Sequence, residues 1–485
     1  MANASNAAPA SAAARPKPSH SDFLSVMEQK KPIGITSGRL FCLFILLVSA
    51  IFAPFYFARE LWFDEALTLQ FALLDSPWEI YKSYTIPNNQ IIHTIGLNWL
   101  LNLGCYPETA RLFPLCCAVI MIWLMWKNFS RELGKNQLLI ALGALIISPP
   151  FWLYASALRG YMLAAMFTVA ALCAGKKYAL GGKYRYLAIW FIMSFLTVGV
   201  MPSALAGIAA AGLYIAPYCG KKFWKNRKIY LLAAAALTGA VIFYLPIKNE
   251  LFKAFELKEG WHHAGFALLA TAIGAGVTFF VPLAAGAFFH RPQLRNWPRT
   301  LIWLLPLGGC LLPVAPFPRV WFVIFPVIAL LCAGFLRRMP EKLLTLTMAA
   351  VLLWGALTLP EYTRKLLSPA VTQAGQDDFF APRFARKSFT VHDTVQFVEK
   401  NSGGAPVFIS FDADPFAVFY AFNDKSRLIM DVPPGKRKVL PDKSLVILGM
   451  EEDAAAVEKR FNASLYEIYH NDLHKVYYLR TNDNE

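Results

Sequence analysis

Long apolar runs alternate with short polar segments along most of this 485-residue chain. A helix needs about 20 residues to cross about 30 Å of hydrocarbon, and many of the runs approach that length. They cover residues 40–58, 111–126, 137–153, 156–175, 186–200, 202–218, 230–247, 264–289, 300–316, 320–336 and 343–360. The pattern therefore predicts a polytopic α-helical membrane protein with about 11–13 transmembrane helices.

One further apolar run, residues 91–104, has a different pattern. It is short, and polar residues recur at four-residue spacing in Gln90, Thr94, Asn98 and Asn102. Four residues make about one helical turn, so these side chains share one face. The pattern favours a helix that lies along the interface or lines a groove over a lipid-exposed span.

The basic residues gather in alternate loops and predict the orientation. With 91–104 left out of the membrane, Lys and Arg concentrate near residues 15–39, 127–135, 176–185, 221–228, 291–299 and 337–342. The positive-inside rule places these segments in the cytoplasm. The N-terminus is then cytoplasmic, and Asp64, Glu65 and everything after residue 360 face the periplasm or the cell exterior.

Composition supports this class of protein. The chain is 56% apolar and only 16% charged, and its net charge of +16 is mainly the orientation signal just described. The segment 361–485 is nearly neutral, so no basic soluble surface indicates a nucleic-acid partner. All eight cysteines precede that segment, and none has the spacing of a metal site.

The chain divides into four parts. Residues 1–38, rich in Ala, Ser and Pro, are expected to be a disordered cytoplasmic N-terminus, and residues 39–360 a transmembrane domain with an elaborate outer loop over 59–110. A linker over 361–387 leads to an exported α/β domain over 388–485. Predicted strands at 407–410, 445–448 and 475–479 alternate there with predicted helices at 391–400, 415–422 and 454–461, which indicates a small, partly parallel sheet. We interpret it as a cap or recognition module.

The adjacent carboxylates of Asp64 and Glu65 stand out because they follow the first span directly, beside Trp62. Charged groups at headgroup depth are costly unless a cation or a proton meets them. From Glu132 to Glu250 no other acidic residue intervenes. The alternative is that both acids lie in water at the start of a helix, where the helix dipole stabilises negative charge.

The order of several segments resembles a known superfamily. Trp62-Phe63-Asp64-Glu65-Ala66 is followed by amphipathic segments, by Asn88-Asn89-Gln90-Ile91-Ile92-His93, and later by the stretches 148–161 and 318–326. This series is similar to the C-type glycosyltransferases (GT-C fold). The likeness is greatest to the bacterial branch related to protein O-mannosyltransferases and lipid A aminoarabinose transferases.

The resemblance implies a bacterial inner-membrane enzyme that moves a hexose or pentose from a polyprenyl-phosphate donor, with inversion. The acceptor would be a glycan, lipid or protein of the cell envelope on the outer face. Asp64 maps to the catalytic aspartate of the family and would be the general base, with Glu65 as a supporting acid.

Cations at the same depth are expected to hold the lipid phosphate. Arg159 and Arg319 each stand at the outer edge of a predicted span, and Arg suits bidentate phosphate binding. The alternative for each is an interfacial arginine that extends its charged group into water and binds no phosphate. Arg111 is a third candidate or an ion-pair partner for Glu108 or Asp64. His93 is a donor-binding or proton-relay candidate, or a structural histidine.

Further substrate contacts are predicted at Asn89, Gln90, Tyr161 and His262, although an interfacial belt also explains the last two. Ala157 stands where many relatives carry an acidic residue in the second outer loop. Because a metal would lose that ligand, a metal-independent reaction is favoured, and a divalent metal stays open.

Two other classes of protein share some of these features. A polysaccharide polymerase or ligase with a polyprenyl-diphosphate donor has a similar topology and similar arginines. A transporter of lipid-linked sugars would need internal repeats and mid-membrane ionisable groups, which the sequence does not display.

Overall fold

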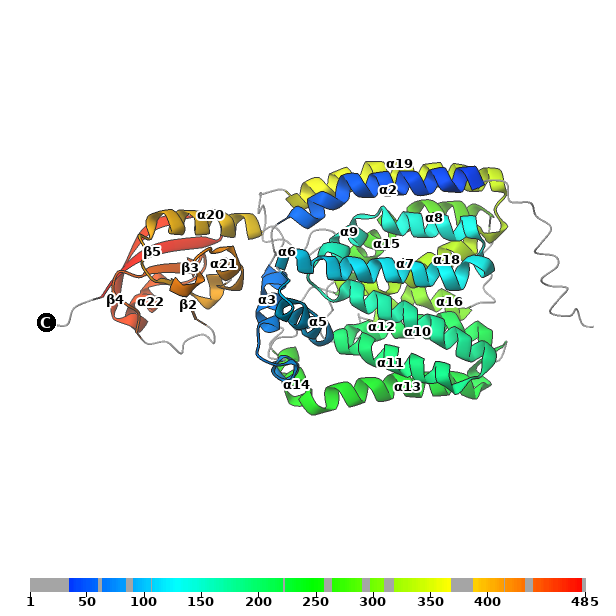
Figure 1. The fold of residues 1–485 in the computed structure, drawn as a ribbon, viewed down its shortest axis with the longest axis horizontal. Helices are drawn as coiled ribbons and strands as arrows, with labels where there is room; N and C mark the ends of the chain where they lie inside the picture. The colour runs from blue at the N-terminus through cyan, green and yellow to red at the C-terminus, as the bar shows by residue number, and fades with distance from the viewer. Residues whose placement is uncertain are drawn as a thin grey trace, which may run out of the picture.

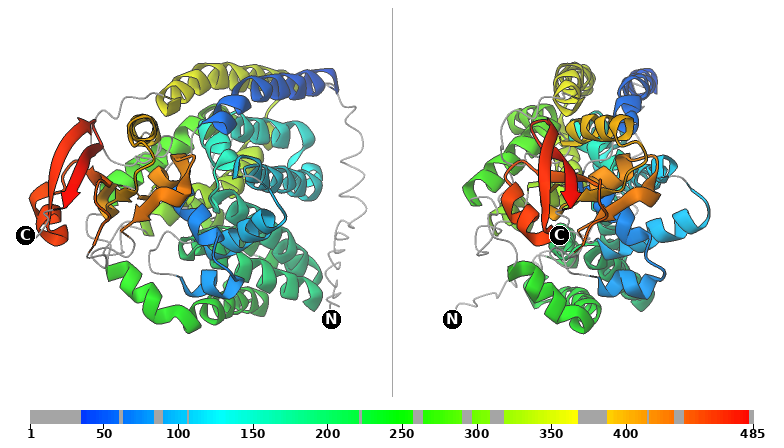
Figure 2. Two further views of the ribbon diagram at one scale, coloured as in Figure 1. Left: turned by 60° about the vertical axis from the view of Figure 1, so that its left-hand side comes forward. Right: turned by 90° about the vertical axis from the view of Figure 1, so that its left-hand side faces the viewer.

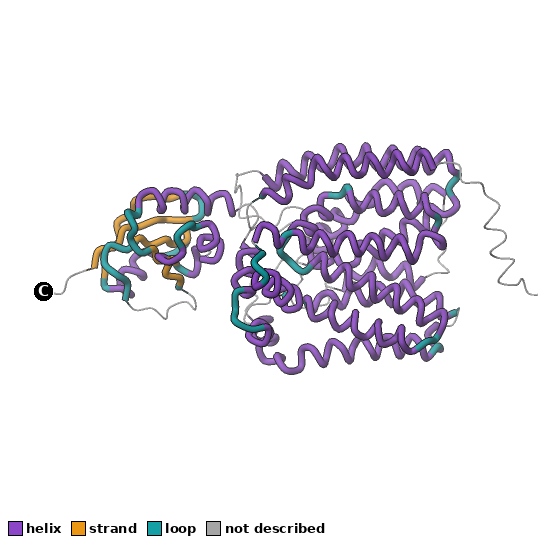
Figure 3. The backbone as a smooth tube through the Cα atoms, viewed as in Figure 1, coloured by secondary structure: helices purple, strands orange, loops and turns teal. Residues whose placement is uncertain are grey.

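The computed structural model is mainly helical, and its strands are confined to the C-terminal part of the chain (Figure 3). It describes residues 35–59, 63–83, 90–105, 107–220, 223–256, 264–289, 297–308, 318–367, 387–413, 415–431 and 439–481. Residues 1–34 of the segment expected to be disordered lie outside this range, and residues 35–38 begin helix α2 (Ile35–Ala58).

All eleven predicted apolar runs overlap helical structure, but not every run forms one continuous span. In the described part of the chain, seven helical segments are long and apolar enough to cross a membrane, or eight with a bent pair included. They are Ser37–Ala58, Leu112–Leu133, Tyr161–Gly181, Pro202–Cys219, Arg227–Phe252, Arg319–Arg338 and Glu341–Arg364. The chain is thus an integral membrane protein. Among the described residues, seven or eight candidate spans stand against the eleven expected.

The other runs differ in length. Tyr184–Val200 is shorter than a full span, whereas the run 264–289 forms one helix of 26 residues, α15 (Ala264–Phe289). The run 300–316 begins as short helical pieces, and its residues 309–316 lie outside the described residues. The bundle consists of α7 (Leu112–Leu133), α8 (Lys135–Ile146), α9 (Pro149–Ser156), α10 (Tyr161–Gly181), α11 (Tyr184–Val200), η1 (Pro202–Ala204), α12 (Leu205–Ile215), η2 (Ala216–Cys219), η3 (Phe223–Lys225), α13 (Arg227–Tyr244), η4 (Leu245–Ile247), α14 (Lys248–Glu256), α15 (Ala264–Phe289), α16 (Trp297–Leu301), η6 (Ile302–Leu304), α17 (Leu305–Gly308), η8 (Pro318–Ile324), α18 (Phe325–Phe335), η9 (Leu336–Arg338) and α19 (Glu341–Leu367), together with α2.

Helices α8 and α9 form the bent pair, with an angle of 65° between them. The break precedes Pro149 and Pro150, which have no backbone N–H to continue the hydrogen-bond ladder of α8. The bend matters for the site because α9 ends at Ser156 and leads into the loop that carries Arg159.

The most buried candidate spans are Arg319–Arg338 and Tyr161–Gly181, with 83% and 67% of their apolar windows inside the protein. Ser37–Ala58 has only 17% buried and leaves most of its apolar surface outward. It lies side by side with α19 along one edge of the bundle (Figure 2). These two spans therefore form the centre of the core. Arg319 begins one of them, and Arg159 lies just before the other.

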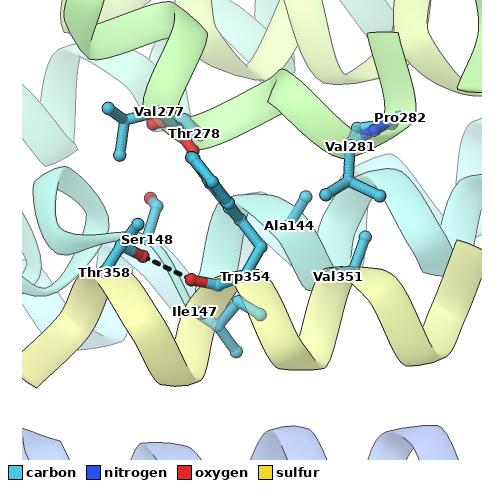
Figure 4. Close-up of a pocket in the computed structure, with 11 residues that line it drawn as sticks. Ala144, Ile147, Ser148, Val277, Thr278, Val281, Pro282, Val351, Trp354 and Thr358 are labelled. Carbon is cyan, nitrogen blue, oxygen red and sulfur yellow. Dashed lines mark hydrogen bonds between the residues drawn. The ribbon is translucent and has the colours of Figure 1, made fainter. Parts of the chain in front are cut away.

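Helices α15 and α19 pack through a tryptophan hydrogen bond. Trp354 Nε1 donates to the Val277 carbonyl at 2.6 Å, and the Trp354 carbonyl accepts from Thr358 at 2.9 Å (Figure 4). The cavity beside them has a volume of about 10 Å³, about the room of one water. It is lined by α8, α15 and α19 together with Ile147 and Ser148, and none of the candidate site residues reaches it.

Short helices cover one end of the bundle: α3 (Phe63–Ala72), α4 (Pro77–Lys82), α5 (Ile91–Asn102) and α6 (Pro107–Ala110) (Figure 1). Ser76 precedes α4, and its hydroxyl accepts the Glu79 N–H as an N-cap. Helix α5 has 12 residues and is not among the candidate spans. Gln90, directly before α5, and Thr94 and Asn98 within it are buried, whereas Asn102 is exposed. Three of the four positions of the polar stripe therefore face the protein.

The C-terminal domain is a five-stranded sheet in the order β2-β1-β3-β5-β4. Strand β1 pairs in parallel with β2 and β3, and β5 pairs antiparallel with β3 and β4, which confirms a partly parallel sheet. Strands β2 and β4 were not predicted. The elements are α20 (Lys387–Asn401), β1 (Val407–Ile409), η11 (Phe411–Ala413), α21 (Pro415–Ala421), η12 (Lys425–Arg427), β2 (Leu428–Met430), β3 (Leu445–Gly449), α22 (Ala454–Phe461), β4 (Ala463–His470) and β5 (His474–Thr481).

This domain lies at the end of the bundle where the short helices are, with α21 next to α3 (Figure 1). Helix α21 directly follows β1 and η11 in the chain. The sheet domain thus contacts the helix that carries Asp64 and Glu65.

Candidate active site

Two carboxylates and four arginines meet at the end of the bundle covered by α3. Asp64 and Glu65 occupy the first turn of α3, where acids favour the positive end of the helix dipole. The arginines come from four separate places: Arg59 after α2, Arg111 before α7, Arg159 in the loop between α9 and α10, and Arg319 at the start of η8. All six side chains are buried, and the most exposed residue, Arg59, is 7% accessible.

Glu65 has a full set of partners. Its carboxylate accepts two hydrogen bonds from Arg59, at 2.6 and 2.9 Å, and one from the Leu158 N–H at 2.8 Å. The Arg111 guanidinium adds an ion pair at 3.6 Å. Burial alone would raise the pKa of Glu65, but Arg59, Arg111 and the Leu158 N–H outweigh it, so the net pKa is lowered. Glu65 is therefore an ionised group that ties α3 to α2, α7 and the α9–α10 loop.

Asp64 has a different partner. One of its carboxylate oxygens lies 2.9 Å from Nη2 of Arg319, which belongs to η8. The Asp64 carbonyl accepts from the Thr68 hydroxyl at 2.8 Å and from Arg159 Nη1 at 3.2 Å. Arg159 Nη1 also donates to the Thr68 hydroxyl at 2.7 Å. Asp64 and both predicted phosphate-binding arginines are thus brought together at one place.

Arg111 is turned toward the backbone. Its Nη1 donates to the carbonyls of Phe57 and Arg59, at 2.6 and 2.5 Å. These bonds close the C-terminal end of α2, where helix carbonyls have no partner within the helix. Arg111 thus forms an ion pair with Glu65, which is neither of the two predicted partners, Glu108 and Asp64.

Gln90 and His93 contribute from the start of α5. The Gln90 side-chain oxygen accepts the Gly160 N–H, which holds the loop of Arg159 against α5. His93 is fully buried, its ring stacks on Phe113 with centroids 5.5 Å apart, and within the described part of the chain neither ring nitrogen has a hydrogen-bond partner. Burial and the nearby Arg159 lower the pKa of His93 to about 3 against the raising effect of Glu65.

Tyr161 lies behind Arg159. The guanidinium carbon is 5.9 Å from the Tyr161 ring centroid, and the Tyr154 ring is 5.1 Å from the same ring. Tyr161 is only 3% accessible and packs as a support of Arg159. Predicted contacts Asn89 and His262 lie outside the described residues.

Sequence reasoning missed three members of this cluster. Arg59 was not predicted as a site residue, although it lies six residues before Glu65 and starts the same outer loop. Thr68 and Gly160 belong to no charge pattern or motif that would mark them as site residues in the sequence. Their roles depend on contacts with residues far away in the chain.

The charged groups of the cluster indicate which ligand it suits. Among the described residues it gathers four guanidinium groups and two carboxylates, all of them buried. Guanidinium groups bind phosphate and carboxylate groups through paired hydrogen bonds, so the arginines suit an anionic ligand. In the described residues no group of three His, Cys, Asp or Glu side chains is arranged to hold a metal.

The fold is similar to that of one protein solved in two states. ArnT from Cupriavidus metallidurans in the apo state is 13% identical, with 89% of this chain and 97% of that chain covered and a TM-score of 0.52. The same protein bound to undecaprenyl phosphate is 13% identical, with 91% and 98% covered and a TM-score of 0.56. No protein-family model and no curated protein matches the sequence. The comparison confirms the expected fold class, a polytopic helical GT-C-like domain followed by a small sheet domain.

Proposed function

We propose that this chain, which has the GT-C fold, is a membrane glycosyltransferase that takes a sugar from a polyprenyl-phosphate donor. The observation that carries the proposal is the buried contact between Asp64 and Arg319, at 2.9 Å, inside a cluster of four buried arginines and two carboxylates. A base and a phosphate-binding cation are thus one hydrogen bond apart. The solved ArnT complex with undecaprenyl phosphate supports a lipid of this kind as the partner.

The donor phosphate would take Arg319 and Arg159 as its cations. Arginine binds phosphate through two parallel hydrogen bonds, which stabilise the charge on a leaving phosphate. When the phosphate occupies Arg319, the carboxylate of Asp64 loses its ion pair and can accept a hydrogen bond from the acceptor. Donor binding would in this way prepare the base.

The transfer is a single displacement. The acceptor oxygen forms a bond to the anomeric carbon as the bond from that carbon to the phosphate oxygen breaks. Asp64 takes the acceptor proton, and the phosphate leaves with the electron pair. One displacement inverts the anomeric centre, and a positioned base contributes about 10²–10⁴ in rate.

Glu65 serves the reaction as a positioning residue. Its carboxylate already accepts from Arg59 and Leu158 N–H and is 0% accessible, so proton transfer to substrate would first require these bonds to break. The bond between Glu65 and Leu158 also fixes their chain neighbours, Asp64 and Arg159. We therefore assign Glu65 to the geometry of the site and Asp64 to proton transfer.

The orientation follows from the helices that start at the site. Helix α7 begins next to Arg111 and runs for about 33 Å at ~1.5 Å per residue, so the basic residues near its end lie at the opposite side of the bundle. The positive-inside rule then puts the site on the periplasmic or outer face. The C-terminal domain, whose α21 contacts α3, would lie over the acceptor side of the site.

Release of polyprenyl phosphate by the purified protein tests the proposal. A panel of undecaprenyl-phosphate sugars is offered with a membrane extract as acceptor, and wild type is compared with Asp64→Asn. Asp75→Asn is the control, because Asp75 is an exposed acid on the same outer segment. Release by wild type and Asp75→Asn, with a loss of about 10²–10⁴ for Asp64→Asn, is expected.

Other outcomes separate the alternatives. Equal release by wild type and Asp64→Asn would remove Asp64 as the base. Consumption of a sugar linked through undecaprenyl diphosphate, with none of the monophosphate panel, would identify a polymerase or ligase. Movement of intact donor across vesicles without release would identify a transporter.

A further inference from the structure

His93 is a buried polar side chain that the proposed chemistry does not use. It sits in the first turn of α5 with 0% accessibility. In the part of the chain that the structure describes, neither of its ring nitrogens has a hydrogen-bond partner. Buried side-chain nitrogens nearly always have one, because an unsatisfied group loses its bonds to water. Both ring nitrogens, Nδ1 and Nε2, are therefore available for a hydrogen bond to a ligand.

The ring is held by a stacking contact and by close packing at its Cβ. One side stacks on Phe113, with an angle of 28° between the planes. Near its base lies the loop of Arg159, since a Cβ added to Gly160 would be 3.1 Å from the His93 Cβ and 3.2 Å from the Gln90 side-chain oxygen. Glycine is the residue that permits this close approach. The imidazole is thus fixed next to the loop that carries a predicted phosphate ligand.

The ring is neutral in this setting. The positive charge of Arg159 and the burial of the ring both disfavour imidazolium, and Glu65 offsets them only in part. A neutral imidazole has one N–H donor and one nitrogen acceptor. It is consequently a poor counter-ion for phosphate, a role that the neighbouring arginines already fill.

A hydroxyl group matches these two positions, because it donates one hydrogen bond and accepts another. A sugar attached to a phosphate brings several hydroxyls within a few bonds of that phosphate. We propose that His93 recognises a hydroxyl of the donor sugar, beside the phosphate held by Arg159 and Arg319. This inference rests on the proposed function and adds a residue that selects the sugar rather than the lipid.

Binding measurements on the full-length protein in detergent separate sugar recognition from phosphate recognition. The probes are undecaprenyl phosphate alone and the same lipid phosphate linked to mannose, glucose or aminoarabinose. His93→Phe removes both ring nitrogens and keeps a ring to stack on Phe113. His93→Gln keeps one donor and one acceptor. Arg319→Gln is the control for the phosphate.

His93→Phe is expected to bind undecaprenyl phosphate as wild type does and to lose about tenfold in affinity for the preferred sugar conjugate. His93→Gln should recover most of that loss, and Arg319→Gln should weaken every probe. Among deoxy forms of the preferred conjugate, one should bind wild type about tenfold more weakly and lose nothing further in His93→Phe. Thermal unfolding of each variant confirms that it is folded.

Equal losses for the free lipid phosphate and its conjugates, or no loss for any probe, would overturn the role of His93. So would a full deoxy penalty retained in His93→Phe. The failure of wild type to bind undecaprenyl phosphate or any conjugate has a separate meaning, because it would refute the proposed function and this inference together.

Discussion

Replacement of Glu65 by glutamine tests the central electrostatic contact of the site. The amide is the same size as the carboxylate but carries no charge, so Arg59 and Arg111 lose the group that compensates them. Glu65 is 0% and the Arg59 side chain 4% accessible, and the closest contact between them is 2.6 Å. Removal of one partner of such a buried pair costs about 3–5 kcal/mol, since the other charge remains buried without compensation.

Thermal unfolding in detergent micelles measures this loss. At about 2 °C for each kcal/mol, a fall in Tm of roughly 6–10 °C is expected. Release of polyprenyl phosphate should fall as well, because Asp64 and the loop of Arg159 lose their anchor. The matched control is Glu361→Gln on α19, which breaks an ion pair with Arg364 of 3.0 Å at an exposed position. Exposed pairs contribute at most about 1 kcal/mol, so its Tm should barely change.

The double variant of Glu65→Gln and Arg59→Gln completes the test. If the two side chains stabilise each other, the double variant should be more stable than the sum of the single losses predicts. Equal Tm values for Glu65→Gln and Glu361→Gln, or strictly additive losses in the double variant, would refute the reasoning that Glu65 is the compensating charge of this cluster.

Three further outcomes are expected. Arg319→Lys replaces a planar fork by a point charge and should raise the Kd of undecaprenyl phosphate about tenfold, whereas Arg337→Lys at an exposed position should leave it unchanged; equal values would remove Arg319 from the phosphate site. The pKa of His93 lies near 3 in the folded protein against an ordinary value of 6.5, so the unfolded chain takes up the proton first and stability, complete above about pH 6.5, falls as the pH drops toward 3. The fall in Tm from pH 7 to pH 5 should therefore be smaller in His93→Gln than in wild type, and equal falls would contradict this. Gly160→Ala places a Cβ 2.4 Å from the Val200 side chain and should cost about 1–3 kcal/mol in unfolding experiments and lower sugar release, whereas Gly212→Ala, with nothing within 4 Å of the added Cβ, should be tolerated; matching losses would argue against a packing role for Gly160.

The apolar pattern was sufficient to predict the helical fold class. It also predicted that the segment of α5 does not form a lipid-exposed span. A 12-residue helix with a polar stripe cannot span a bilayer, and the same stripe faces the protein in Gln90, Thr94 and Asn98. The pattern was weaker on the number of full spans. Apolar content does not reveal where a helix breaks, as at Pro149 between α8 and α9, or that the Tyr184–Val200 helix is short.

In the C-terminal domain, local signals predicted the strands β1, β3 and β5 but not β2 and β4. A buried strand is a continuous apolar run, whereas β2 is only three residues long and half-buried. Strand β4 is an edge strand with mixed exposure, and it exists because β5 pairs with it. Pairing partners decide such strands, and the sequence of the strand itself contains little of that information.

The sequence by itself determined that this is a membrane protein, that the acids of α3 and the arginines at the span edges belong to one face, and that Asp64 was the residue to examine. Only the tertiary structure decided that Arg319 pairs with Asp64, that Arg59 and Arg111 pair with Glu65, and that His93 lies against the loop of Arg159. The physical reason is that ion pairs and close packing depend on distances of a few ångströms between residues far apart in the chain. Helix periodicity orients a side chain within its own helix, but the packing of helices against one another selects its partner.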